Sequence, residues 1–336
     1  MVDNRAAILT GAKAAHTLHR DLGIREQIER GTTSRIDVFS TIAKLGATLM
    51  FQPLDKLLGA YLPAEELGVL ITTKRPLPVQ RFTGAHELGH LYMRHEPSLD
   101  DDSILRRSPF ATTGTANRQE READAFASMF LTPAWLVALV LQRQRWSARQ
   151  LADPAFLYQA SLRLGTSYRA TCFAIERHKV ITRGQREQLI DIEPKSIKQQ
   201  LLGSYEPPDW RADVWLLTEH DEGSFIEGGR NDLFVVKLRE NSGAGYLWNF
   251  DQLRDAGFAL VDDDREDTSP NAIGGALTRK VTARSKDRVQ GEVTLRESRP
   301  WATDVALHQL RLRYDLRGPE SPGMWEPELR RVLQAA

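Results

Sequence analysis

The hydrophobic pattern of the chain changes after about residue 205. Before that point, apolar residues recur at the i, i+3, i+4 spacing of a helix, which predicts helices over residues 36–45, 118–130, 135–150 and 157–178 and one that opens at Phe82. The apolar run 67–72 predicts a strand, residues 5–65 otherwise alternate helical segments with turns, and the polar stretch 97–117 predicts an exposed loop.

Beyond residue 205 the apolar runs are short and separated by turn residues, which predicts strands over residues 213–218, 233–238, 257–261, 277–283, 291–295 and 306–314. Short strands at this spacing favour an antiparallel sandwich or barrel. Consecutive prolines at 207 and 208 indicate a linker. We expect an α+β domain over residues 1–205, an all-β domain over 206–320, and a tail over 321–336 with a short helix that packs back on one domain.

Composition narrows the function classes. The 336 residues carry 45 basic and 45 acidic side chains, so no net charge draws the whole molecule to nucleic acid or to an anionic membrane. The single cysteine, Cys172, excludes an intramolecular disulfide framework, and it lies in an apolar helical segment where a buried thiol is expected. No apolar stretch approaches about 20 residues. We expect a cytoplasmic protein that does not bind nucleic acid or membranes directly.

The helix that opens at Phe82 contains the sequence His86-Glu-Leu-Gly-His90. Histidines at i and i+4 project from one helical face and can hold one zinc ion. A catalytic zinc keeps three protein ligands and an open position for water. Glu87, next to the first histidine, can take the proton of that water as general base.

A third ligand is expected from the predicted helix 118–130. Glu120 and Asp124 are four residues apart and share a face, so Glu120 can bind the metal while Asp124 accepts a hydrogen bond from a ligand histidine. Glu122 points about 200° around the helix from Glu120, so only one of the two should reach the zinc. We favour Glu120 over Glu122, because only Glu120 has the supporting acid at i+4.

Residues 68–71, 80–90 and 120–133 together resemble the ImmA/IrrE-type metallopeptidases, over roughly residues 5–195. The resemblance implies a zincin-like fold and a zinc-dependent endopeptidase, often one that cleaves a helix-turn-helix repressor in a stress, phage or mobile-element response. Members often have Asn where Asp124 stands and Met where Thr132 stands, and neither change removes a ligand. This chain shows no convincing helix-turn-helix segment, so a repressor would be a separate protein.

The β-rich part resembles chagasin-type inhibitors of papain-like cysteine proteases, over roughly residues 210–317, in segments 238–248, 274–279 and 298–301. The resemblance implies an immunoglobulin-like sandwich with partner-binding loops, here Asn241, Gly243, Gly245, Tyr246, Gly274, Gly275, Arg299, Pro300 and Trp301. The first loop reads Asn241-Ser-Gly-Ala-Gly245 where the family usually has Asn-Pro-Thr-Thr-Gly. Loss of the proline and threonines removes rigidity and hydroxyl groups, which argues against inhibition.

Other residues near these motifs have simpler interpretations. His95 could stabilise an oxyanion, but we expect it to be solvent-exposed, about 140° beyond His90 on a continued helix. Tyr92 is expected to pack rather than to act in catalysis. Trp248 is expected in the core of the sandwich and Trp301 on its surface.

The sequence thus predicts a zinc endopeptidase whose β domain recruits the substrate or covers the active-site cleft. One alternative is an inhibitor of a cysteine protease in which the zinc fold is a scaffold. Another is a zinc sensor with little turnover. Glu87 favours catalysis, because a purely structural zinc site has no need of a base.

Overall fold

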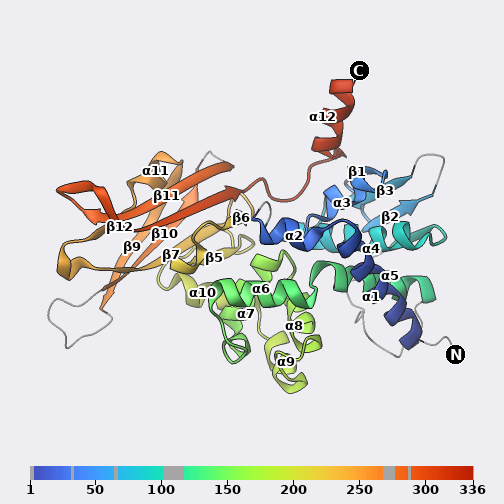
Figure 1. Ribbon diagram of the computed structural model, residues 1–336, viewed down its shortest axis with the longest axis horizontal. Coiled ribbons are helices and arrows are strands. Elements are labelled where there is room, and N and C mark those ends of the chain that lie inside the picture. Colours follow the sequence, from blue (N-terminus) through green and yellow to red (C-terminus); the bar gives the residue numbers. More distant parts are fainter. Residues whose placement is uncertain are drawn as a thin grey trace. The chain divides into compact units, whose positions relative to one another are not determined.

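A computed structural model describes residues 4–31, 34–63, 67–100, 117–267, 277–286 and 289–335 (Figure 1). The chain packs as two compact units. Unit 1 comprises Met1–Ala138, Arg163–His178 and Pro319–Ala336, and unit 2 comprises Leu139–Leu162 and Lys179–Gly318. This division differs from the predicted domain limits at residues 205 and 320.

Unit 1 combines helices with a mixed sheet. Its strands are β1 (Thr48–Gln52), β2 (Gly59–Leu62), β3 (Gly68–Thr72), β4 (Ser98–Asp100) and β13 (Gly323–Met324), in the order β13-β1-β3-β2-β4. Only the β1–β3 pair is parallel among these described strands. The helices are α1 (Asn4–Asp21), α2 (Ile24–Glu29), α3 (Val38–Lys44), α4 (Leu77–Met93), α5 (Arg118–Leu131), the start of α6 (Ala134–Gln144), α8 (Tyr168–Arg177) and α12 (Glu326–Ala335).

Several elements of the first 178 residues differ from the prediction. Helix α4 begins at Leu77 rather than at Phe82, because Pro76 caps the helix and Pro78 lies in its first turn, where no backbone N–H is needed. The expected helix 157–178 is two helices, α7 (Pro154–Leu164) and α8, since Gly165 has a left-handed φ of 66° and Ser167 caps α8. Strands β1 and β2 lie where helices and turns were expected, and β4 lies in the expected loop, of which residues 101–116 fall outside the described part.

The segment Arg118–Gln144 contains an 18-residue window that is apolar enough to cross a membrane, with a mean hydropathy of 1.7. It consists of α5 and α6, separated at Thr132 and Pro133. Because 61% of its most apolar window is buried inside the protein, it has the character of a pair of core helices.

Unit 2 contains two four-stranded sheets, in the orders β5-β7-β10-β9 and β6-β12-β11-β8. The strands are β5 (Val214–Leu217), β6 (Phe225–Glu227), β7 (Leu233–Glu240), β8 (Leu247–Asn249), β9 (Phe258–Asp267), β10 (Leu277–Ser285), β11 (Gln290–Arg299) and β12 (Ala302–Asp315). Each segment predicted as a strand contains one. The sheets are not wholly antiparallel, because β5–β7 and β6–β12 are parallel pairs. Phe258 and Tyr314 join the two sheets with ring centroids 5.1 Å apart. The fold is α+β with an immunoglobulin-like sandwich, as predicted.

Helices α7, α9 (Arg183–Ile190) and α10 (Pro194–Leu202) belong to unit 2. Gln159 of α7 pairs with strand β5 as a neighbouring strand would, donating to Val214 O at 2.7 Å and accepting from Leu216 N at 2.8 Å. Leu202 of α10 joins a buried apolar cluster with Val214. The linker at residues 206–209 therefore lies inside a packed unit.

The C-terminal tail belongs to unit 1. Strand β13 pairs with β1, and the Trp325 amide donates to Leu49 O at 2.9 Å. The Glu320 amide donates to Gln80 Oε1 of α4 at 2.9 Å. The short helix predicted for the tail is α12, so residues after the β-rich unit complete the sheet beside which α4 lies.

We predict that Trp325→Ala destabilises unit 1 by about 3 kcal/mol, since removal of a buried indole leaves a cavity in addition to lost burial. Trp325 is 9% exposed, whereas Trp301 is 74% exposed. Trp301→Ala is therefore the matched control and should change stability by less than about 1 kcal/mol. Urea unfolding of both variants in the full chain measures the difference, and a Trp325→Ala effect as small as the one expected for the control would show that Trp325 does not stabilise unit 1.

Candidate metal centre

Helix α4 presents His86 and His90 on one face, as their spacing requires. The helix is buried along most of its length, and His86, Glu87 and His90 are each fully shielded from solvent. Imidazole and carboxylate groups are rarely buried without partners, because their desolvation costs free energy. The side chains around these three residues therefore determine whether the site can bind a metal.

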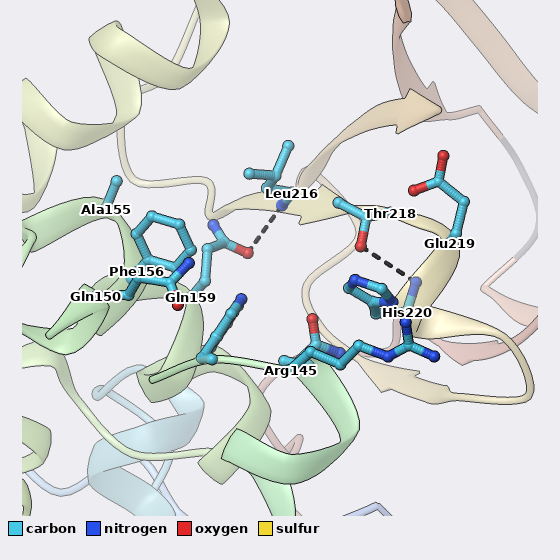
Figure 2. A pocket seen from close by; sticks show the side chains of 11 residues that line it. Arg145, Gln150, Ala155, Phe156, Gln159, Leu216, Thr218, Glu219 and His220 are labelled. Atoms are coloured by element: carbon cyan, nitrogen blue, oxygen red, sulfur yellow. Dashed lines mark hydrogen bonds between the residues drawn. The ribbon is translucent and has the colours of Figure 1, made fainter. Parts of the chain in front are cut away.

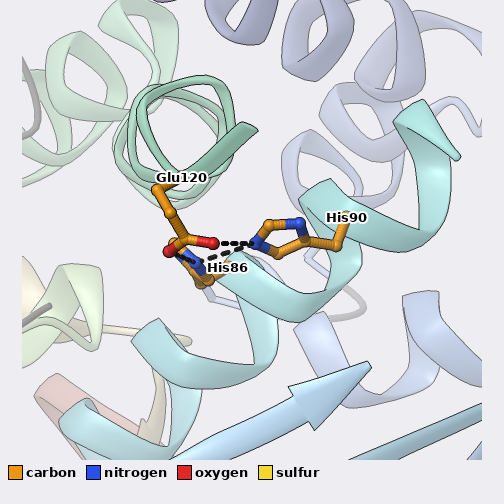
Figure 3. Close-up of side chains that lie close together, drawn as sticks. All are labelled: His86, His90 and Glu120. Carbon is orange, nitrogen blue, oxygen red and sulfur yellow. Dashed lines mark hydrogen bonds and ion pairs between the residues drawn. The ribbon is translucent and has the colours of Figure 1, made fainter. Parts of the chain in front are cut away.

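Helix α5 supplies the third group. Gly89 of α4 faces Ala123 of α5 so closely that a Cβ at Gly89 would lie 3.2 Å from the Ala123 Cα. This approach brings the Glu120 carboxylate to 3.5 Å from His86 Nε2 and 3.6 Å from His90 Nε2 (Figure 3). The two Nε2 atoms are 3.0 Å apart. The structure thus brings together the three residues predicted as ligands.

These donor atoms fit a zinc ion. One atom from each of His86, His90 and Glu120 lies within 4.8 Å of the others. Tetrahedral zinc with ligand bonds of about 2.0–2.2 Å keeps its donor atoms roughly 3.3–3.5 Å apart. Two imidazoles and one carboxylate also form the donor set of catalytic zinc sites with an open position for water.

Asp124 of α5 lies beside His86. Its Oδ1 is 3.1 Å from His86 Nδ1, and the residue is 2% exposed. A carboxylate that accepts a hydrogen bond from Nδ1 leaves Nε2 of the same ring as the electron-pair donor. His86 therefore has its Nε2 oriented toward Glu120 and its Nδ1 toward Asp124.

His95 differs from its prediction. It is 9% exposed rather than solvent-exposed, and its Nδ1 lies 3.0 Å from His90 Nδ1. Helix α4 ends at Met93, its C-cap Arg94 has a left-handed φ of 56°, and the chain turns so that the His95 amide donates to His90 O. An angle calculated for a continued helix misplaces the ring. Burial lowers the pKa of His95, which favours the neutral ring.

Glu122 has a different place from Glu120. Its Oε2 lies 3.0 Å from His95 Nε2, and its Oε1 accepts a hydrogen bond of 2.8 Å from Arg118 Nε. Glu122 is thus connected to His90 through His95. Helical spacing makes Glu122 an alternative ligand but does not predict its contact with His95, because that contact depends on the turn after α4.

Glu87 lies beneath strand β2. A Cβ at Gly59 would be 2.7 Å from Glu87 Oε1 and 2.5 Å from Thr83 Cγ2, so the strand passes directly over the carboxylate. Two residues considered beside the motif are packing residues: Cys172 is fully buried, and the ring of Tyr92 lies 6.1 Å from that of Phe126.

In unit 2, the first and third chagasin-like loops lie together. The Trp301 ring rests on Gly245, where a Cβ would be 2.9 Å from it, and Arg299 stacks over Tyr246 at 4.6 Å. The Asn241 side chain donates to the buried Glu297 at 3.1 Å, while Gly243 and Pro300 are exposed. Trp248 is 3% exposed, as expected of a core residue. Gly274 and Gly275 lie outside the described residues.

Unit 2 also has a cavity of about 300 Å³ beside α7 and strand β5 (Figure 2). Trp146 and Phe156 form one wall, with rings that meet edge to face at 5.5 Å. Gln159, held by Leu216, forms another part of the lining. The mainly apolar lining suits an apolar group better than hydrolytic chemistry.

Comparison with known proteins identifies two domain families. Residues 42–177 match the peptidase family described as the IrrE N-terminal-like domain, and residues 229–316 match the chagasin family peptidase inhibitor I42. No curated protein matches the chain.

Two solved structures are similar to part of the chain. The cysteine protease inhibitor EhICP2 from Entamoeba histolytica is 25% identical with a TM-score of 0.28, over 32% of this chain and 97% of the inhibitor. Amebosin is 18% identical with a TM-score of 0.26, over 31% of this chain and 97% of amebosin.

We predict that Gly59→Ala destabilises the protein by about 1–3 kcal/mol, because its Cβ overlaps Thr83 and the Glu87 carboxylate. Gly184→Ala is the matched control, since Gly184 lies in helix α9 with nothing within 4 Å of an added Cβ. That change should stabilise by about 0.5–1 kcal/mol. Thermal unfolding of both variants measures the signs, and a neutral Gly59→Ala would mean that β2 is not in close contact with Glu87.

Proposed function

Because the chain carries an IrrE-like metallopeptidase domain followed by a chagasin-family domain, we propose that it is a zinc-dependent endopeptidase with a protein-recognition module. The observation that carries the proposal is the convergence of His86, His90 and Glu120 from two helices, with Glu87 beside the first histidine. The family of the first domain is one of metallopeptidases, which implies a metal.

In this proposal His86, His90 and Glu120 hold the zinc ion. When bound, zinc lowers the pKa of a water molecule and polarises the carbonyl that is attacked. Glu87 takes the proton of the attacking water and passes it to the leaving amine. The Asp124 carboxylate, whose Oδ1 lies 3.1 Å from His86 Nδ1, favours the proton on that nitrogen and so keeps the Nε2 electron pair of the ring available.

The substrate in this proposal is a specific cytoplasmic protein, such as a helix-turn-helix repressor of a stress, phage or mobile-element response. The support is the resemblance of residues 80–90 and 120–133 to ImmA/IrrE-type enzymes, together with the single cysteine, which fits a reducing compartment. Nucleic acid and membranes are not proposed as partners, since the net charge is zero.

The loops of unit 2 are proposed to bind a protein partner, either the substrate or a regulator. Trp301 is exposed although it is a large apolar residue, and Arg299 holds the Tyr246 ring at 4.6 Å beside the same loop. Tryptophan, tyrosine and arginine are the residue types that most often anchor protein interfaces. The chagasin-family match over residues 229–316, rather than the sequence of the first loop, supports a second candidate function, inhibition of a papain-like protease.

We predict about one zinc per chain in the wild type and loss of that zinc in Glu120→Gln, because the amide is a poorer ligand than the carboxylate. Glu122→Gln is the matched control and should still take up one zinc when the metal is in excess. Metal analysis after reconstitution, with circular dichroism as a check of folding, measures both. Loss of zinc only in Glu122→Gln would mean that the third ligand is Glu122 and not Glu120.

We further predict that Glu87→Gln lowers peptide hydrolysis by about 10²–10⁴-fold while zinc content is unchanged, since the variant keeps the ligands and loses the base. Cleavage of a peptide library, followed by mass spectrometry, measures the loss.

The wild type and Glu87→Gln also separate the two alternative functions, the zinc sensor and the cysteine-protease inhibitor. A zinc-loaded wild type that cleaves no peptide or co-encoded repressor would favour the sensor. Tight inhibition of papain that survives Glu87→Gln and is lost in Trp301→Ala would favour the inhibitor.

A further inference from the structure

A buried side-chain network lies behind His90, outside the proposed ligand set. It runs from His90 Nδ1 to His95 Nδ1 at 3.0 Å, from His95 Nε2 to Glu122 Oε2 at 3.0 Å, and from Glu122 Oε1 to Arg118 Nε at 2.8 Å. His95 and Glu122 are 9% and 6% exposed. The Arg118 side chain, at the outer end, is 62% exposed.

Arg118 and Glu122 determine the hydrogen-bond directions at the outer end of this network. Arg118 can only donate and the Glu122 carboxylate can only accept, so His95 Nε2 must carry a proton and donate to Glu122. A neutral His95 then has an unprotonated Nδ1, which accepts from His90 Nδ1–H. His90 in turn has no proton on Nε2, and this atom faces Glu120. Each donor in the network meets an acceptor.

We propose that His95 is a positioning residue that, held by Glu122, fixes the tautomer and ring orientation of His90 and thereby sets the zinc affinity of the site. The inference rests on the proposed zinc site. It assigns to His90 the kind of support that Asp124 gives to His86 through His86 Nδ1 at 3.1 Å. Partners of ligand histidines raise the basicity of the ring and reduce the freedom it must lose on binding.

The backbone also supports this role for His95. The His95 amide donates to the carbonyl of His90 itself at 3.0 Å, so the two residues are connected through both backbone and ring. Their rings meet at 73° with centroids 4.9 Å apart. Such contacts hold His95 in place independently of any metal.

The test compares the zinc affinity of His95→Leu and His95→Gln in the full chain, by competition with a chromophoric chelator. Leucine removes both polar atoms, and we expect about 10- to 100-fold weaker zinc binding. The amide of glutamine can accept from His90 and donate to Glu122, so His95→Gln should stay within about threefold of the wild type. This rescue distinguishes positioning from a merely structural role.

A second variant keeps the test decisive if His95→Leu folds poorly. Glu122→Gln should weaken zinc binding by a smaller factor, and the double variant with His95→Leu should bind no more weakly than His95→Leu alone, because the residues act as one network. His19→Leu is the matched control: His19 is 5% exposed and its Nε2 lies 3.0 Å from Phe130 O. It should leave the zinc affinity unchanged.

The outcomes separate this inference from the proposed function. Zinc affinity unchanged in His95→Leu, or additive losses in the double variant, would overturn the positioning role and leave the peptidase proposal intact. A zinc-binding wild type that is sensitive at His95 but cleaves nothing would overturn only the peptidase. A changed visible spectrum of the cobalt-substituted protein in His95→Leu, restored in His95→Gln, is the expected independent support.

Discussion

Helices α4 and α5 approach each other closely because Gly89 presents no side chain to Ala123, where an added Cβ would lie 3.2 Å from the backbone. The candidate metal centre depends on this spacing. Two of its groups come from α4 and the third from α5, so any increase in the distance between the helices withdraws the Glu120 carboxylate from both histidines. The same spacing brings Asp124 to His86 and Glu122 to His95.

Three acidic residues within five positions of α5 face different nitrogen atoms of three histidines. Glu120 faces the Nε2 atoms of His86 and His90, Asp124 faces His86 Nδ1, and Glu122 faces His95. Burial of an unpaired carboxylate costs free energy. The histidine beside each of these acids lowers that cost. The result is a set of donor atoms held in position by side-chain contacts, which favours tight coordination.

The sequence segments of the two units are interleaved. The chain passes from one unit to the other at residues 138, 162, 178 and 318. The family match over residues 42–177 therefore excludes α1, which packs on α5, and includes α7, whose Gln159 pairs with strand β5. It also excludes β13, which lies at the edge of the sheet beside β1. The peptidase-like unit is complete only in the full chain, so its chemistry is best studied there.

The sequence by itself determined the features that follow from local periodicity. The i, i+4 spacing places His86 and His90 on one face of α4, and Glu120 and Asp124 on one face of α5. Short apolar runs separated by turn residues identified strands of the sandwich. Tertiary structure decided the rest. Strands β1 and β2 are short and depend on their partner β3, and Gln159 joins α7 to β5 across 55 residues. His95 was placed on a continued helix, whereas Arg94 turns the chain and buries the ring against His90, because the end of a helix depends on packing that local spacing does not encode.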